Sequence, residues 1–106
     1  MQLVSLEMAM RQLRLIAGDD IPEDHEDRSE VEFRLKHATE IVLDYIKDRD
    51  NKNGWTEETA PGAVQASILI VLSDLWEHRA GSSSDDVFIS VAVERLLHRY
   101  RDPALA

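Results

Sequence analysis

The sequence predicts an all-α fold: a small four-helix domain with long polar loops and a buried third helix at its centre. Three observations lead to this prediction. Apolar residues recur at helical spacing in three segments and less regularly in a fourth, strand-like alternation is scarce, and capping residues, Gly and Pro separate the segments. A chain of 106 residues has room for one modest core, so we expect a single domain over 1–106.

The first two predicted helices lie in the N-terminal half. Ser5 is expected to cap the first helix, and Gly18 to end it. Its apolar stripe is Leu6, Met10, Leu13 and Ile16. After an acidic loop with Pro22, Ser29 and Glu32 have the spacing of a capping box at the start of the second helix. The stripe of that helix is Val31, Leu35, Ala38, Val42, Tyr45 and Ile46, and Ile41 widens it.

The third predicted helix runs from Pro61 to about Arg79 and is apolar on most of its circumference. A helix of this kind usually lies at the centre of a fold. One face carries Val64, Ile68, Leu72, Leu75 and Trp76, and we expect Leu72 and Trp76 to be buried. The segment 48–60 that precedes this helix is polar and long for a connection between helices, and long loops often carry function.

The fourth predicted helix follows the flexible stretch 81–84 and ends before Pro103. Asp85 or Asp86 could cap it, and its start is poorly defined because its apolar residues are irregularly spaced. Those residues are Val87, Val91 and Leu97. The segment 87–91 also alternates like a strand, but we assign it to the helix.

Composition excludes several kinds of function. The chain has no cysteine, so disulfides, thiolate nucleophiles and Cys-type zinc sites are excluded. Its net charge is −9, and it lacks the clustered Lys and Arg that binding to duplex DNA requires. The first residues do not resemble a signal peptide, and no apolar run is long enough to span a membrane. We therefore expect a soluble protein without membrane contact, made in the cytoplasm.

Two sets of residues could in principle bind a metal. The acidic segment 48–54 looks like a calcium loop, but its Gly comes one residue late and Thr59 stands where the bidentate acid belongs. Asp74 and His78 stand one helical turn apart, and His37 or His98 could add a third ligand. We favour a hydrated turn for the first and a surface hydrogen bond for the second. With no catalytic motif or phosphate-binding loop, we expect a non-enzymatic protein without metal or cofactor.

Aromatic and basic residues in the C-terminal third are candidates for an interface. Trp76 and Tyr100 could anchor the core between the third and fourth helices, or lie at contacts between subunits. Arg95, Arg99 and Arg101 form a basic cluster in an otherwise acidic chain. They could be solvated residues at a helix C-terminus or a docking site for an acidic partner.

The same third resembles the head–tail connector family of tailed bacteriophages, also called adaptor or head completion proteins. The segments PGAVQASILIVLSDLWEHR and VERLLHRYRDPAL resemble the family's buried helix, which ends in an aromatic and a polar run with an Arg, and its closing "LL..YR" helix. The opening VSLEMAMRQLRL resembles the family's first helix, and EVEFRLKHATEIVLDYI takes the place of its second. Two departures are the charged Asp74 and the absence of a Pro before Val91.

This resemblance implies a structural protein of the virion, located at the head–tail junction. It would form a homo-oligomeric ring, a dodecamer, between the portal protein and the stopper or tail completion protein. The ring would extend the DNA channel, through which DNA passes without specific binding. The expected portal or subunit interface is Trp76, Arg79, Arg95, Arg99, Tyr100 and Arg101. The C-terminal segment is expected to carry much of the portal contact.

Two other classes of function remain open on the residues alone. One is a small acidic cytoplasmic interaction module, similar to an antitoxin or the partner of a regulator, which would form a discrete dimer without affinity for a portal. The other is a metal-dependent enzyme that uses Asp74 and His78, which would retain metal after purification.

Overall fold

The computed structural model describes residues 2–18, 22, 24–78 and 90–100. In these ranges the chain forms four α-helices and one short 3-10 helix, and no strand. They are α1 (Leu6–Gln12), α2 (Arg28–Tyr45), α3 (Gly62–Glu77), α4 (Val91–Leu97) and η1 (His98–Tyr100). The predicted all-α class is confirmed.

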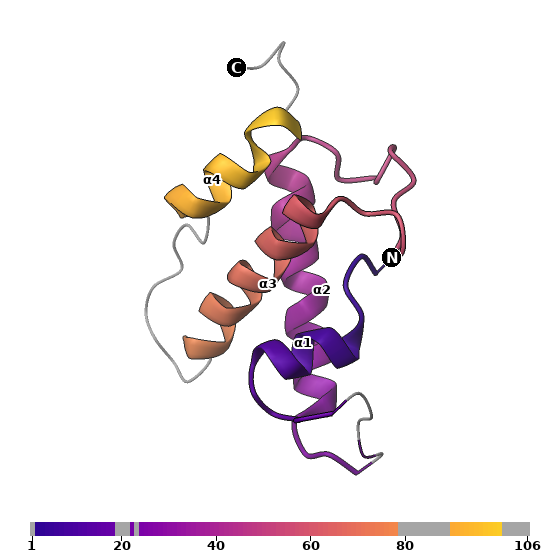
Figure 1. Cartoon of the computed structure of the whole chain (residues 1–106), viewed down its shortest axis with the longest axis vertical. Coiled ribbons are helices and arrows are strands. Elements are labelled where there is room, and N and C mark those ends of the chain that lie inside the picture. The colour runs from indigo at the N-terminus through magenta and orange to yellow at the C-terminus, as the bar shows by residue number, and fades with distance from the viewer. Residues whose placement is uncertain (1, 19–21, 23, 79–89, 101–106) are drawn as a thin grey trace.

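Helix α3 is the central element of the fold. It packs against α1, α2 and α4, whereas α2 and α4, as described, do not contact each other (Figure 1). The molecule is thus built around α3, with α4 on one side and α2 on another. The prediction of a central third helix is confirmed.

The core is formed mainly by the facing stripes of α2 and α3. The predicted α2 stripe is buried except for Tyr45, which is partly exposed and packs against the core. The largest fully buried side chains come from all parts of the fold and include Leu3, Met10, Leu43, Ile68, Leu72 and Leu97. Burial of such apolar area is the main favourable term in folding, so this shared core holds the four helices together.

The outer side of α3 is apolar but only half-buried. Leu69, Ile70 and Trp76 pack against the edge of the core and remain partly exposed. The expectation for Leu72 is confirmed because its side chain is 0% exposed, but the expectation that Trp76 is buried is wrong. The hydrophobic pattern of α3 therefore describes a helix with one buried face and a second apolar face that its own subunit covers incompletely.

Helix α1 ends earlier than the sequence predicted. Ser5 caps it as expected, accepting a hydrogen bond from the Met8 backbone N–H at 3.1 Å. The helix stops at Gln12, well before Gly18, because Arg14 adopts a left-handed conformation with φ of 61°. The Leu15 N–H then reaches the Met10 carbonyl at 2.9 Å, which closes a Schellman motif. Arg14 has the role that the prediction gave to Gly18.

Helix α2 begins at Arg28, so its N-cap position lies two residues before the predicted cap at Ser29. Asp27 is the N-cap residue, but its side chain caps no backbone group. Instead the His25 ring organises this end: Nδ1 accepts from the Asp27 N–H at 3.1 Å, and Nε2 lies 3.3 Å from the Leu15 carbonyl. A neutral ring with its proton on Nε2 satisfies both contacts and joins the end of α1 to the start of α2. The capping prediction for Ser29 is wrong because this tertiary contact sets the start of the helix.

Helix α4 begins at Val91, and Ser90 caps it by accepting from the Val93 N–H at 3.3 Å. The proposed caps Asp85 and Asp86, and the predicted helical residue Val87, lie outside the described residues. Within α4, Val93 and Leu97 are fully buried one helical turn apart. Val91, one of the irregularly spaced apolar residues of this segment, is 62% exposed because it lies on the opposite side of the helix.

Candidate interaction surfaces

The loop between α2 and α3 is held in shape by hydrogen bonds within the loop itself. Lys47, with φ of 63°, ends α2 in a second Schellman motif, in which the Asp48 N–H donates to the Leu43 carbonyl at 2.8 Å. The Asp48 side chain is buried and accepts from the Lys52 N–H at 2.6 Å and from the Asn53 side-chain amide at 2.8 Å. These donors occupy the carboxylate that a calcium site would need, so this loop is a closed turn rather than a metal site.

The ordered loop places Trp55 against the C-terminal end of the described chain. Asn51 makes two hydrogen bonds to the Trp55 backbone, at 2.9 and 3.2 Å. The Trp55 ring meets the Tyr100 ring edge to face, with centroids 6.0 Å apart. The sequence suggested that Tyr100 could join Trp76 between α3 and α4, but its ring partner is Trp55. A segment far away in the sequence thus supports η1.

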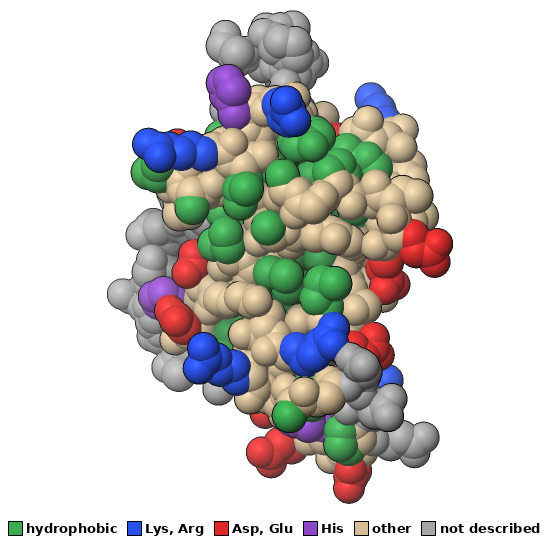
Figure 2. Space-filling view, viewed as in Figure 1, with side chains coloured by type: hydrophobic (Ala, Val, Ile, Leu, Met, Phe, Trp, Pro, Cys, Tyr) green, Lys and Arg blue, Asp and Glu red, His purple; other side chains and the backbone are tan. Residues whose placement is uncertain are grey.

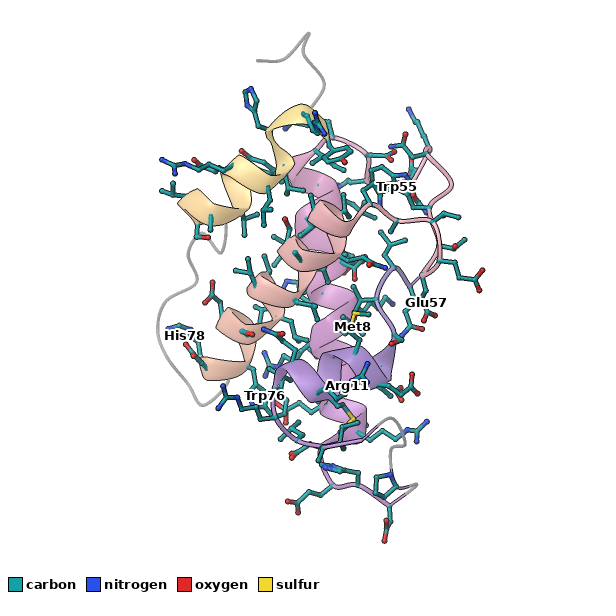
Figure 3. The ribbon with its side chains drawn as sticks, in the orientation of Figure 1. Met8, Arg11, Trp55, Glu57, Trp76 and His78 are labelled. Carbon is teal, nitrogen blue, oxygen red and sulfur yellow. The ribbon has the colours of Figure 1, made fainter. Side chains whose placement is uncertain are left out.

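The predicted interface residues do not form one cluster. Figure 3 shows Trp76 and His78 at the end of α3, whereas Trp55 lies near its start. Arg95 and Arg99 are exposed on α4 and η1, and Tyr100 is partly exposed. Arg79 and Arg101 lie outside the described residues. The structure therefore separates the Trp76 end of α3 from the basic side chains of α4.

The pair Asp74 and His78 makes a local contact at the end of α3. The His78 Nδ1 atom lies 2.7 Å from the backbone carbonyl oxygen of Asp74, not from its carboxylate. Burial raises the pKa of the Asp74 carboxyl above its usual value of 3.8, and nearby Glu77 raises it further, while His78 lowers it. Among the described residues, no group of three His, Cys, Asp or Glu side chains is arranged to hold a metal ion.

The charged side chains are unevenly distributed over the surface. In the view of Figure 2, Lys and Arg lie over α4 and also in the lower half of the molecule, while Asp and Glu lie over the loop before α3, on the opposite side and at the lower end. Arg95 and Arg99 are the exposed basic residues of α4 and η1, and Glu57 and Glu58 belong to the loop before α3. Charges of both signs are therefore spread over this view of the subunit, with a local basic group at α4.

Among the residues that the structure describes, two large apolar side chains are well exposed: Phe33, at 65%, and Val91, at 62%. Phe33 lies on the outer side of α2 and stacks against the Arg34 guanidinium, whose carbon is 5.9 Å from the ring centroid. The sequence interpretation missed Phe33, although its position outside the α2 stripe was the signal that could have identified it. In the described part of the chain, no helix combines the length and apolarity needed to cross a membrane.

The sequence of this chain is similar to that of a known phage protein. The protein named head completion protein gp6, from Enterobacteria phage HK97, is 26% identical to this chain over 83 residues, which cover 71% of this chain and 77% of that protein. No protein-family model matches the chain, and no solved structure matches it. The similarity extends over most of the chain and agrees with the resemblance found in the sequence. The chain is therefore similar in sequence to a head completion protein of a bacteriophage.

Proposed function

We propose that this protein is a structural subunit of the phage virion, forming a ring between the portal and the stopper or tail completion protein. The observation that carries the proposal is its similarity, over 71% of its length, to a protein named for head completion. The described surface supports a role based on interfaces rather than catalysis. It carries exposed apolar and basic side chains, such as Phe33, Val91 and Arg95, whereas the candidate metal residues are engaged in local contacts.

The ring proposed here is a dodecamer located at the head–tail junction and assembled in the host cytoplasm. A cyclic ring needs two different faces of each subunit to meet. An acidic channel wall would repel DNA phosphates, so the duplex would pass without adhering. The net charge of −9 predicts no measurable binding of the free protein to duplex DNA at physiological salt. Micromolar binding that weakens steeply with salt, measured by fluorescence anisotropy, would contradict this channel.

Contact with the portal is proposed for the C-terminal end of the chain. Arg99 is exposed immediately before the end of the described residues, and Arg101 follows it. Arg and Tyr are the residue types that most often anchor interfaces. Because Leu97 belongs to the core, a deletion from Glu94 onward would also unfold the protein, so a charge reversal is the better test.

The decisive experiment is co-sedimentation of the purified protein with portal, followed by imaging of the assembly. We expect a ring attached to the portal, and loss of attachment in the double variant Arg99→Glu with Arg101→Glu at unchanged helicity and melting temperature. Arg11→Glu with Arg14→Glu, which makes the same charge change at exposed positions near the end of α1 and outside the loop 48–60, is the control. If the Arg double variant still attaches to portal, the docking surface lies elsewhere, and the loop 48–60 is the next candidate. A discrete dimer that never attaches to portal would favour an acidic interaction module instead.

A further inference from the structure

Two outward faces of the subunit have complementary patterns. The α4 face consists of Val91, Ala92, Arg95 and Leu96, all of them exposed or partly exposed. The α2 face consists of Phe33, His37, Glu40, Ile41 and Asp44, each of which lies three or four residues from another member. Each face combines apolar side chains with charge, and Arg95 on α4 and Glu40 on α2 carry opposite charges without an ionic partner among the described residues.

The α4 face is an apolar stripe with a free cation. On the seven-residue helix α4, Val91 is 62% exposed and Leu96 is partly buried. Arg95 is exposed and forms no salt bridge with any other described residue. On the opposite side of the helix, Val93 and Leu97 are fully buried, so they hold this face outward.

The α2 face is hollowed and partly apolar, and its lining carries charges of both signs. One shallow hollow is lined by His37, Glu40, Ile41, Asp44 and Arg49. A second adjoins it, lined by Phe33, Lys36, His37 and Glu40, and the two share His37 and Glu40. Asp44 is already paired with Arg49 at 2.8 Å, whereas Glu40 has no ionic partner among the described residues. Glu40 is therefore the acid available to an incoming cation.

The placement of the two faces prevents them from meeting within one subunit. Helix α3 runs between α4 and α2, and each face points away from α3, because the opposite side of its helix is buried (Figure 1). Two complementary faces on different sides of one subunit produce head-to-tail contacts, which close into a ring when the rotation between copies permits it.

We propose that the α4 face of one copy docks on the α2 face of a second copy of this chain. Val91 and Leu96 would pack against Phe33 and Ile41, and Arg95 would pair with Glu40. A second copy is the occupant that fits because the chain supplies both halves of the contact in matching pattern and opposite charge. The contact deepens the ring of the proposed function and rests on it, since it names the surfaces through which subunits meet.

The absence of cysteine makes the contact testable by crosslinking. His37→Cys and Ala92→Cys, combined in one chain, place one thiol on each face and keep Val91, Leu96, Phe33 and Ile41, the side chains proposed to pack together. With a short bis-maleimide crosslinker, the double variant should give a ladder of species beyond the dimer, whereas each single variant stops at the dimer. The control pair Gln12→Cys with Glu58→Cys, at exposed positions off both faces, should give no ladder. No ladder from the His37 and Ala92 pair at the highest soluble concentration would overturn the proposal.

Charge reversal provides an independent test by sedimentation velocity. Arg95→Glu and Glu40→Lys should each weaken self-association about tenfold or more, and the double variant should recover most of the loss because attraction is restored with the signs exchanged. Glu58→Lys makes the same charge change as Glu40→Lys away from both faces and should have no effect. Failure of the double variant to recover would overturn the Arg95–Glu40 pairing.

Binding to portal separates this contact from the proposed function. If the wild-type protein attaches to portal but the variant with His37→Cys and Ala92→Cys gives no ladder, the contact between faces is refuted and the proposed function is kept. Conversely, a ladder from a protein that never attaches to portal would support the contact and remove the proposed place of the ring in the virion.

Discussion

Two isoleucines on α3 allow the orientation of the central helix to be tested with matched substitutions. Ile68 is 0% exposed at the interface with the other helices, whereas Ile70 lies on the half-buried outer side. Ile→Ala removes three carbon groups at roughly 0.8 kcal/mol each, and a cavity term is added where the site cannot relax. We expect Ile68→Ala to lower the free energy of unfolding by about 3–4 kcal/mol. Ile70→Ala should cost about 1 kcal/mol, since much of its surface is already in contact with water.

The assay is urea unfolding followed by helical circular dichroism at several protein concentrations. A domain of this size has a total stability of roughly 5–15 kcal/mol, so the loss at Ile68 should be plain in the unfolding midpoint. The two variants should be compared at low protein concentration, because subunit contacts then do not cover the outer side of α3. Equal losses at both positions under these conditions would refute the described orientation of α3. A loss at Ile70 that grows only at high concentration would instead show that this side is covered on association.

The remaining predictions concern the loop, the helix ends and the pH dependence of stability. Asp48→Ala should lower stability by about 2 kcal/mol, because a buried carboxylate that orders the loop is lost, and Asp48→Asn should lose less; thermal melting measures both. Lys47→Gly should raise stability by roughly 0.5–1 kcal/mol, since glycine adopts the left-handed conformation at this position without strain; a lower melting temperature would contradict this. Asp74→Asn should stabilise the protein by a few tenths of a kcal/mol at pH 7, because a charged Asp74 is disfavoured by burial and by the C-terminal end of the helix. Because the pKa of Asp74 is raised in the folded state, the stability of the wild-type protein falls as pH rises from the ordinary value of 3.8 through the folded-state pKa. The difference in stability between Asp74→Asn and the wild type should therefore disappear in acid. A difference that grows in acid would refute the raised pKa of Asp74.

The sequence pattern was sufficient for the elements that make the core. The apolar spacing of Val31, Leu35, Ala38 and Val42 predicted the buried side of α2, and Pro61 placed the start of α3 within one residue. These predictions succeeded because a long amphipathic helix must bury its apolar face in any compact fold. The same spacing predicted the all-α class, and the segments of the C-terminal third predicted the similarity to a phage head completion protein.

Helix ends and exposure depended on contacts between distant residues. Arg14 ends α1 in a conformation that sequence rules assign to glycine, and His25 starts α2 through its contact with the Leu15 carbonyl. The pattern also could not show that Trp55 contacts Tyr100, because a ring contact between a loop and the last helical turn leaves no periodic signal. Predictions failed where the local preference was weak and a tertiary hydrogen bond or packing contact decided the conformation.

The sequence by itself determined the fold class, the faces of α2 and α3 that meet in the core, and the acidic charge of the protein. Only the tertiary structure decided which apolar residues remain outside the core, because periodicity defines a face but not what covers it. Trp76, expected to be buried, is half-exposed, while Phe33 and Val91 are directed to the surface on different helices. Those exposed positions, with Arg95 and Glu40 beside them, are candidate interfaces because α3 holds α4 and α2 apart.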